Sequence, residues 1–279
     1  MLIRAFLYIV RPINVLISLL SVYLGGIISI DKFYSDSLLL ACISAAFIAG
    51  FGNTCNDIFD IEVDKRSKPF RPLPSSLVSV KSAIVLALIM AICGLVLAAL
   101  INIQCLIIAS LASLGLFLYT PFFKGSGYVG NILISIISAT AFFYGAASVG
   151  NIRGGLIPAA FAFLFHLVRE IVKDMEDFDV DRNCNVKTGA VKYGFAVSRF
   201  LAVGFTILLV FATIVPYLIK IYGLVYLVVV IFGTDLFLLY FVICLIRSPE
   251  KRTYRFVAGF MKAVMPLGIL AVFIGSKGY

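Results

Sequence analysis

The sequence predicts an all-α fold, a multi-pass membrane bundle of about nine transmembrane helices. The first observation is composition: of 279 residues, 62% are hydrophobic and only 13% are charged. That apolar content exceeds what a soluble domain of this length needs for its core. The second observation is that apolar runs recur along the chain, mostly close to the ~20 residues that cross ~30 Å of hydrocarbon. A helix satisfies its own backbone hydrogen bonds in a bilayer, so each run is expected to be helical.

The expected spans follow one another with short connections on the outer side. We place them at residues 13–30, 37–53, 82–101, 103–120, 129–149, 155–168, 200–217, 224–246 and 259–275. The first run follows two arginines, and no convincing small-residue cleavage site comes after it, so we expect a retained span. The sixth run is short, and it is expected to continue as one helix into the polar stretch behind it.

Lys and Arg residues predict the orientation. With the N-terminus in the cytoplasm, most of the 23 Lys and Arg residues fall in cytoplasmic segments. The outer side then keeps Lys32, Arg153, Lys220 and Lys277. The positive-inside rule therefore predicts a multi-pass protein of the cell membrane with a cytoplasmic N-terminus. The net charge of +9 is divided among loops beside the spans, so membrane lipids are expected neighbours and nucleic acid is not an expected partner.

Most of the 14 acidic residues lie in two short stretches, Asn56–Arg66 and Lys173–Asn183, both on the predicted cytoplasmic side. The stretches align without a gap, so that Asp57 matches Asp174, Asp60 matches Asp177 and Asp64 matches Asp181. This internal repeat predicts one domain, residues 1–279, with halves made of helices 1–4 and 5–8 and a ninth, extra helix. Two such halves are expected to present their acidic stretches to a central cavity, with an active site at its cytoplasmic side.

Helical geometry gathers the polar residues of each stretch on one face. At about 100° per residue, one face of the first stretch carries Asn53, Asn56, Asp57, Asp60 and Asp64. The same arithmetic predicts that one face of the second carries Glu170, Asp174, Asp177 and Asp181. Glu176 and Asp179 are predicted to point away from that face.

A stripe of like charges on a helix is unstable unless cations lie on it. Hard oxygen ligands at this spacing suit Mg²⁺, which usually takes one or two carboxylates together with phosphate oxygens and waters. Basic residues flank both stretches: Arg66, Lys68, Arg71, Lys124, Arg169, Lys173 and Lys187. Acidic residues that could bind a metal ion thus alternate with Lys and Arg residues that could bind phosphate. This combination predicts a diphosphate site. Two simpler interpretations of these residues stay open. The acids could be ordinary solvated residues at helix ends, and the Lys and Arg residues could reflect only the positive-inside rule.

These residues resemble the UbiA superfamily of intramembrane prenyltransferases. The first family motif corresponds to Asn56, Asp57, Asp60 and Asp64, followed by Arg71 and Pro72. The second corresponds to Lys173, Asp174, Asp177 and Asp181. Two shorter family segments correspond to Arg11, Pro12 and Asn14, and to Tyr119, Lys124, Gly130 and Asn131. One departure is Lys65, where some relatives carry Arg.

The resemblance implies a mechanism in which two Mg²⁺ ions bind a prenyl diphosphate donor, whose allylic C–O bond ionises before an acceptor captures the carbon. It implies the metal-binding and catalytic residues Asn56, Asp60, Asp64, Asp174, Asp177 and Asp181. It implies the substrate-binding residues Asn14, Asn53, Asp57, Arg66, Lys68, Arg71, Tyr119, Lys124, Asn131, Arg169, Lys173 and Lys187.

The residues in and around both motifs are similar to those of the archaeal branch of the family. That branch makes digeranylgeranylglyceryl phosphate for ether lipids. That branch implies geranylgeranyl diphosphate as donor and the sn-2 hydroxyl of 3-O-geranylgeranylglyceryl phosphate as acceptor, a lipid-like molecule bearing a phosphate. Two alternatives stay open. One is the same chemistry with an aromatic or quinone-precursor acceptor. The other is a cation transporter, for which Asp235 is the one acid inside a late span.

Overall fold

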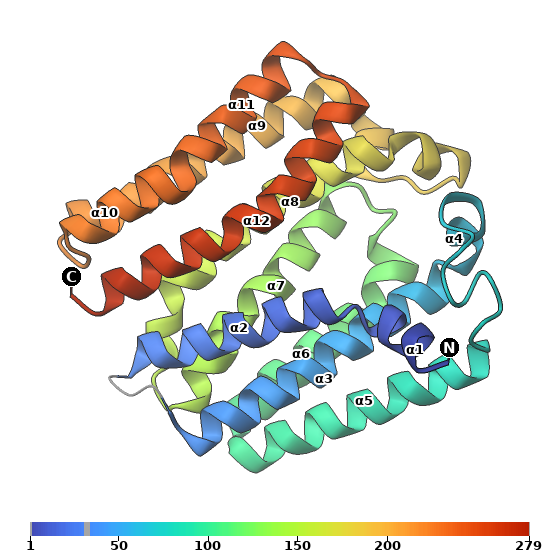
Figure 1. Ribbon diagram of the computed structural model, residues 1–279, viewed down its shortest axis with the longest axis horizontal. Coiled ribbons are helices and arrows are strands. Elements are labelled where there is room, and N and C mark those ends of the chain that lie inside the picture. Colours follow the sequence, from blue (N-terminus) through green and yellow to red (C-terminus); the bar gives the residue numbers. More distant parts are fainter. Residues whose placement is uncertain (1, 31–33, 279) are drawn as a thin grey trace. The chain divides into compact units, whose positions relative to one another are not determined.

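The computed structural model describes residues 2–30 and 34–278, and these ranges contain helices and no strand (Figure 1). The all-α prediction is therefore confirmed for the part of the chain that is described. Lys32, which the orientation argument assigned to the outer side, lies outside the described residues.

Within the described ranges, nine helical segments are long and apolar enough to cross a membrane. They are α2 (Pro12–Ser29), α3 (Asp36–Phe59), α5 (Val80–Ile101), α6 (Ile103–Leu118) with η1 (Tyr119–Phe123), α7 (Tyr128–Ser148), η2 (Ile152–Gly155) with α8 (Leu156–Asn183), α9 (Gly189–Leu218), α10 (Leu224–Val230) with η3 (Ile231–Asp235) and α11 (Leu236–Arg247), and α12 (Lys251–Ser276). The predicted number and order of spans are confirmed.

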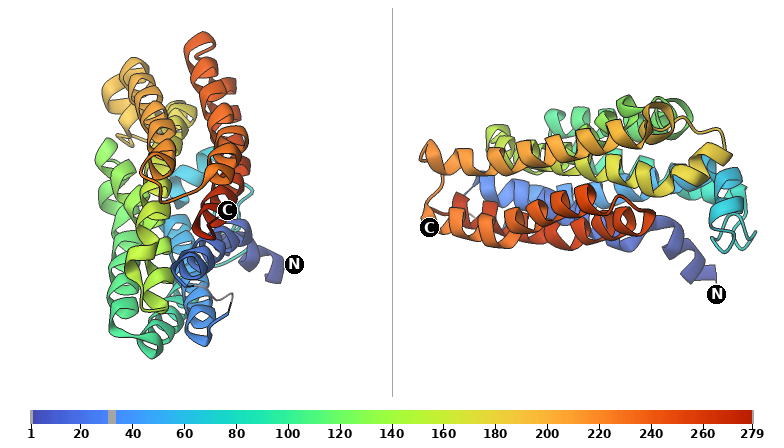
Figure 2. Two further views of the ribbon diagram at one scale, coloured as in Figure 1. Left: turned by 90° about the vertical axis from the view of Figure 1, so that its left-hand side faces the viewer. Right: turned by 90° about the horizontal axis from the view of Figure 1, so that it is seen from above.

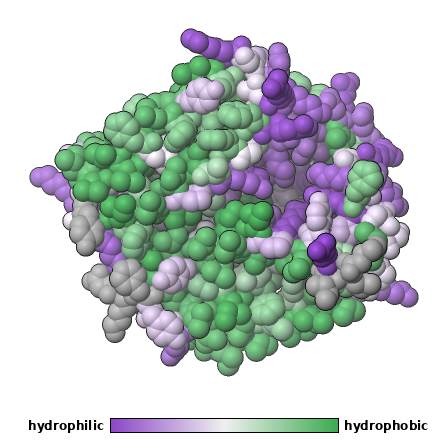
Figure 3. Space-filling view, in the orientation of Figure 1, coloured by the Kyte–Doolittle hydropathy of each residue, from purple (hydrophilic) through white to green (hydrophobic). Residues whose placement is uncertain are grey.

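The outward faces of these helices are apolar. Large side chains such as Leu88, Leu111 and Phe211 are 56%, 64% and 66% exposed. Figure 3 shows hydrophobic side chains over much of the visible helix surface. Such a surface is costly in water and favourable against lipid tails, as expected for a multi-pass integral membrane protein.

Several helix boundaries differ from the predicted ones. The sixth span does continue through the acidic stretch, since α8 is one helix to Asn183. The segments that contain the seventh and ninth spans begin before the apolar runs at 200 and 259, because α9 begins at Gly189, with a kink at Gly194, and α12 begins at Lys251. Apolarity marks only the part of a helix that meets hydrocarbon, whereas the helix itself extends into the polar region. The short helix α1 (Leu2–Val10) was not expected.

The first of two compact units comprises Met1–Gly125 and Thr140–Leu156. In it α3 packs against α1, α2, α5 and α6 (Figure 1). Helix α2 and the last part of α7 approach closely at two glycines. A Cβ added to Gly145 would lie 1.9 Å from the Val22 carbonyl oxygen, and one added to Gly25 would lie 2.2 Å from that of Phe142. Larger residues at these positions would push the two helices apart.

The second unit comprises Ser126–Ala139 and Ile157–Tyr279. Its core surrounds α8, whose Ile171 and Met175 are buried with Leu238 of α11 and Met261 of α12. Helices α9, α11 and α12 run alongside one another (Figures 1 and 2). The tight packing around α8 holds the second acidic stretch on a rigid helix.

Asp235 lies in η3, inside the eighth span, and is 3% exposed. The Thr213 hydroxyl lies 3.0 and 3.2 Å from its two carboxylate oxygens. A buried acid with a hydrogen-bond donor is a satisfied group, so Asp235 gives no specific support to the transporter alternative.

Candidate active site

The first acidic stretch is carried by two helices. Helix α3 ends at Phe59, Asp60 leaves helical geometry with φ −87° and ψ 7°, and α4 (Ile61–Ser67) follows. The prediction of one unbroken helical face is therefore wrong at Asp60. Backbone hydrogen bonds from Asp60 N to Asn56 O (2.9 Å) and from Asp64 N to Asp60 O (2.8 Å) nevertheless bridge the break. The acids thus stay on consecutive turns.

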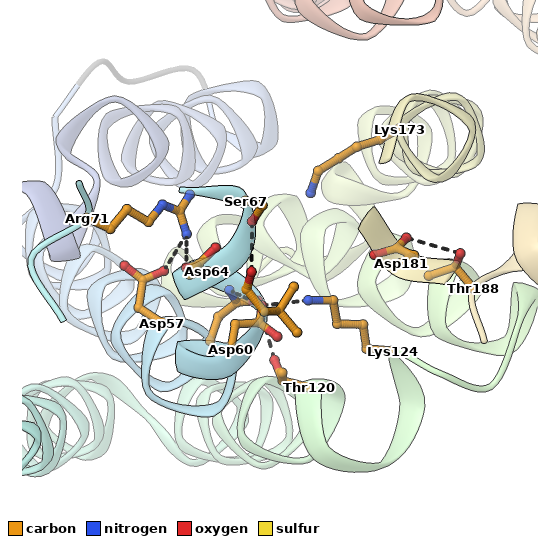
Figure 4. Close-up of polar contacts among 12 residues, drawn as sticks. Asp57, Asp60, Asp64, Ser67, Arg71, Thr120, Lys124, Lys173, Asp181 and Thr188 are labelled. Atoms are coloured by element: carbon orange, nitrogen blue, oxygen red, sulfur yellow. Dashed lines mark hydrogen bonds and ion pairs between the residues drawn. The ribbon is translucent and has the colours of Figure 1, made fainter. Parts of the chain in front are cut away.

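All three aspartates of the first motif are buried, with Asp57, Asp60 and Asp64 exposed by 3%, 7% and 3%. A buried carboxylate is costly unless a cation or hydrogen bonds compensate it. Arg71 supplies a positive charge and hydrogen bonds to two of these carboxylates. Its Nη1 lies 3.2 Å from Asp57 Oδ1 and 2.6 Å from Asp64 Oδ2 (Figure 4). Arg11 forms a second ion pair with Asp57.

Asp60 has a different set of partners. Lys124 Nζ lies 2.6 Å from Asp60 Oδ2, and Asn56 Nδ2 donates to the same oxygen at 3.0 Å (Figure 4). The Thr120 hydroxyl donates to Asn56 Oδ1 at 3.3 Å. Thr120 lies in η1 and Lys124 directly after it, so this irregular turn brings the lysine to the first acidic motif.

The environment keeps Arg71 charged. Burial alone would lower the pKa of the Arg71 guanidinium, but the carboxylates of Asp57 and Asp64 outweigh it and raise the pKa above its ordinary value. Arg71 is therefore a permanent cation beside the first motif.

Sequence reasoning missed Arg11 and Thr120 as site residues. Arg11 belongs to the short RPxN segment, which was the available signal, but nothing in the sequence paired it with Asp57. Asn53, expected to bind substrate, instead donates from Nδ2 to the Val10 carbonyl oxygen at 2.8 Å. It therefore fixes the junction that carries Arg11.

The second acidic stretch lies within α8, where the helical prediction applies without a break. Asp174 Oδ2 accepts from Asn131 Nδ2 and from the backbone N–H of Gly189, both at 3.1 Å. Gly189 is the first residue of α9, whose first turn is separated from the rest of the segment by a non-helical backbone at Gly194, with φ 83° and ψ 168°. The Thr188 hydroxyl donates to Asp181 Oδ2 at 3.2 Å (Figure 4).

The remaining groups of this stretch divide into two sets. Glu170, on the predicted stripe, pairs with Arg169 at 2.5 Å and with Lys173 at 3.9 Å. Among the described residues, Asp177 has neither a hydrogen bond nor an ion pair, and it is only partly buried. An unpaired carboxylate on this face remains available to a ligand.

The two acids predicted to point away from the stripe have partners on another helix. Glu176 pairs with Arg255 at 3.1 Å and Asp179 with Lys251 at 2.8 Å, both from the first turns of α12. These contacts differ from those of Asp174 and Asp181, as the helical arithmetic predicts.

The other predicted site residues differ in exposure. Arg66, Lys68 and Lys187 are exposed, and Asn14 and Tyr119 are partly buried. Lys187 also accepts a hydrogen bond at its main-chain oxygen, from Gly127 N at 3.0 Å.

The donor set of the first motif fits Mg²⁺ in chemistry. Asn56, Asp60 and Asp64 offer hard oxygens, and Mg²⁺ needs only one or two carboxylates when phosphate and water complete its shell. In the part of the chain that is described, no group of three or more His, Cys, Asp or Glu side chains is arranged to hold a metal ion without other ligands. A metal ion at this motif would need further ligands, such as waters or phosphate oxygens.

Comparison with known proteins agrees with the motifs. The model of the UbiA prenyltransferase family matches residues 15–264. The digeranylgeranylglyceryl phosphate synthase of Methanococcus aeolicus is 34% identical over 276 residues, 98% of each chain. That of Methanopyrus kandleri is 36% identical over 268 residues, 96% of this chain and 97% of the relative.

Solved structures give the same result. One described for digeranylgeranylglyceryl phosphate synthase in membranes has a TM-score of 0.80 and 33% identity, covering 99% of this chain and 98% of the other. A UbiA homologue from Archaeoglobus fulgidus bound to GPP and Mg²⁺ shares the fold, with a TM-score of 0.73, 18% identity and coverage of 96% and 99%. The predicted resemblance is confirmed: this chain belongs to the UbiA prenyltransferase family.

Proposed function

We propose that this enzyme transfers a geranylgeranyl group from geranylgeranyl diphosphate to the sn-2 hydroxyl of 3-O-geranylgeranylglyceryl phosphate, in archaeal ether-lipid synthesis. The observation that carries the proposal is identity of 34–36% to digeranylgeranylglyceryl phosphate synthases along nearly the whole chain. The buried carboxylates beside Arg and Lys support it, because a diphosphate donor with metal ions needs both kinds of group.

The reaction breaks the allylic C–O bond of the donor, and diphosphate leaves with the bonding electron pair. The sn-2 oxygen of the acceptor bonds the same carbon and releases its proton. Lys124 and Arg71 are proposed to hold charge on the leaving diphosphate, since both lie against the carboxylates of the first motif. The apolar spans around them exclude water, which would otherwise capture the carbon.

Mg²⁺ is the proposed metal, and the chemistry it supplies is neutralisation of the leaving diphosphate. Its proposed ligands are Asn56, Asp60 and Asp64 in the first unit and Asp174, Asp177 and Asp181 in the second. Relatives of this fold bind GPP or DMAPP together with Mg²⁺, and one binds Cd²⁺, which supports a divalent ion. The oxygen-only donor set favours Mg²⁺ over softer ions.

The protein is proposed to lie in the cell membrane with its N-terminus and both acidic stretches on the cytoplasmic side. The distribution of Lys and Arg supports this orientation. The single prenyltransferase domain over residues 1–279, its internal repeat and its central cavity likewise stay predictions.

The test is product analysis with purified protein in lipid nanodiscs. Labelled geranylgeranyl diphosphate is offered with the glyceryl phosphate ether, with its dephosphorylated alcohol, or with 4-hydroxybenzoate, and products are identified by mass spectrometry. We expect the phosphorylated ether to react fastest. Faster prenylation of 4-hydroxybenzoate would contradict the assigned acceptor and favour the quinone-precursor alternative.

A further inference from the structure

One buried acid lies outside both acidic stretches, close to the middle of the eighth span. Asp235 is 3% exposed, and the proposed reaction gives it no part. Along Leu224–Arg247 the other charged residue is Arg247, at the very end of the span. An ionised carboxylate at this depth is costly unless a cation or several hydrogen bonds compensate it. The surroundings of Asp235 therefore bear on its charge.

No charged side chain compensates Asp235. In the described part of the chain it forms no ion pair, and its hydrogen-bond partner is Thr213 of α9. Residues 202–218 of α9 and 263–276 of α12, which belong to the adjoining helices, contain no Asp, Glu, Lys, Arg or His. The hydroxyl of the neighbouring Thr234 is buried without a hydrogen-bond partner among the described residues, so it does not donate to the carboxylate either.

The titratable groups on the adjoining helices are neutral at physiological pH. Tyr226 of α10 is fully buried, and its hydroxyl donates to the Thr213 carbonyl oxygen at 2.6 Å. Within residues 202–218, 221–246 and 263–276, the remaining titratable side chains are Tyr217, Tyr222, Tyr240 and Cys244. Phenols and thiols keep their protons at neutral pH, so none of these groups supplies a charge.

The contacts of Thr213 bear directly on the protonation state of Asp235. The Thr213 hydroxyl oxygen lies 2.7 Å from the Val210 carbonyl oxygen, and 3.0 and 3.2 Å from the two side-chain oxygens of Asp235. A hydroxyl carries one hydrogen, whereas a carbonyl and a carboxylate carry none. With Asp235 ionised, that hydrogen serves either Val210 or Asp235. The other contact is then a close approach of two oxygens with no hydrogen between them, which leaves a buried acceptor unsatisfied.

A protonated carboxyl group removes this conflict. Its O–H donates to the Thr213 hydroxyl, and that hydroxyl donates to the Val210 carbonyl, so each contact contains a hydrogen. The same proton removes the negative charge, and no cation is then needed. Neutral Asp235 therefore accounts both for the hydroxyl contacts and for the absence of charged neighbours in the described residues.

We propose that Asp235 is a protonated carboxylic acid at neutral pH, and that its proton joins η3 to α9 through Thr213. This hydrogen-bonded chain of Asp235, Thr213 and Val210 is a pH-sensitive clamp inside the second unit, because ionisation of the acid breaks it. The inference does not depend on which acceptor the enzyme prenylates.

The clamp gives the pH dependence of stability a definite sign. In the unfolded chain an exposed aspartate is ionised at neutral pH. The folded protein then binds one proton more than the unfolded chain, so its stability falls as the pH rises. Asp235→Asn has no such proton, and its unfolding midpoint should fall less steeply with rising pH than that of wild type. Identical slopes would contradict the proposal.

The direct test is difference infrared spectroscopy at neutral pH, in a detergent without carbonyl groups. The spectrum of wild type minus Asp235→Asn should contain the C=O stretching band of a protonated carboxyl group. The control is Asp179→Asn, which removes an exposed acid and should remove carboxylate bands instead. Loss of carboxylate bands in Asp235→Asn as well would show that Asp235 is ionised and would overturn the inference.

Unfolding midpoints test the partner. Thr213→Val leaves the carboxyl group without its hydrogen-bond acceptor and should lower the midpoint by about 5 °C or more. The matched control is Thr206→Val, because Thr206 is as buried on the same helix and its hydroxyl donates to the Ala202 carbonyl oxygen at 2.6 Å, within that helix. Its midpoint should change by about 2 °C or less. Equal losses in the two valine variants would show that Asp235 does not use Thr213.

The amide of Asp235→Asn can still donate to Thr213, so this variant is expected to fold. If it does not, Thr213→Val carries the infrared test, because the carboxyl band must shift when its hydrogen-bond acceptor is removed. An infrared spectrum that is unchanged in the carboxyl region would then overturn the inference.

Discussion

The two acidic stretches align residue for residue, yet their carboxylates are stabilised by different means. In the first, each aspartate of the motif contacts an arginine or a lysine. In the second, Asp174 accepts from an amide and a backbone N–H, and Asp177 has no partner among the described residues. Similar motifs can therefore differ in electrostatic role. The carboxylates of the first stretch are balanced by cations of the protein, whereas those of the second are stabilised by neutral donors or, at Asp177, have no partner among the described residues.

The largest expected effect tests whether both stretches are essential. Asp60→Ala and Asp177→Ala should each lower kcat on the order of 10²–10³-fold, the typical cost of losing an electrostatic stabiliser. Chelation by EDTA should abolish turnover. Rates are measured with labelled donor, and thermal unfolding checks that each variant is folded. Turnover that survives EDTA would contradict the metal proposal.

The next comparison is within the second stretch. Asp181→Asn should reduce kcat roughly 100-fold, because Asp181 is buried on the predicted metal face. Asp179→Asn should reduce kcat less than about fivefold, because a free energy of ~1 kcal/mol, the value of a surface ion pair, corresponds to that factor. Both variants are assayed under the same saturating substrates. Equal losses would refute the separation of the two faces.

At the first stretch we expect a substitution to strengthen metal binding, a smaller effect than the losses of kcat above. Lys124 and a metal ion compete for Asp60 Oδ2, so Lys124→Met should raise the affinity of the free protein for Mn²⁺ about three- to tenfold. The same variant should raise the KM of the donor, because a diphosphate contact is lost. Mn²⁺ binding is followed by electron paramagnetic resonance without substrate. Weaker Mn²⁺ binding would show that Lys124 supports the metal instead of competing with it.

The smallest effect concerns the backbone donor to Asp174. A Cβ at Gly189 would lie 2.3 Å from a ring carbon of Tyr128, so Gly189→Ala should destabilise the fold by ~1–3 kcal/mol. Gly204 lies in the same segment α9, beyond the kink at Gly194, and a Cβ there would meet nothing within 4 Å. Gly204→Ala is therefore the control and should not lower the unfolding midpoint. Equal midpoints for the two variants would remove the argument for close packing at Gly189.

The sequence predicted the spans and the acids because both depend on local composition and on periodicity. Helical arithmetic separated Asp179 from Asp181 because α8 is unbroken. The same arithmetic failed at Asp60, because the spacing of residues in the sequence does not reveal that one helix ends there and another begins. The pairing of Arg11 with Asp57 joins residues 46 positions apart, and no local rule can assign such a partner. The cations could be recognised as a group, but not matched to individual carboxylates.

The left-handed backbone at Arg11 also affects how related sequences should be interpreted. Glycine or asparagine would relax that junction, whereas only arginine offers a forked cation there. The backbone conformation and the ion pair with Asp57 thus favour different residues at one position. A natural relative with glycine at the corresponding position would be expected to leave the matching aspartate with one cationic partner instead of two.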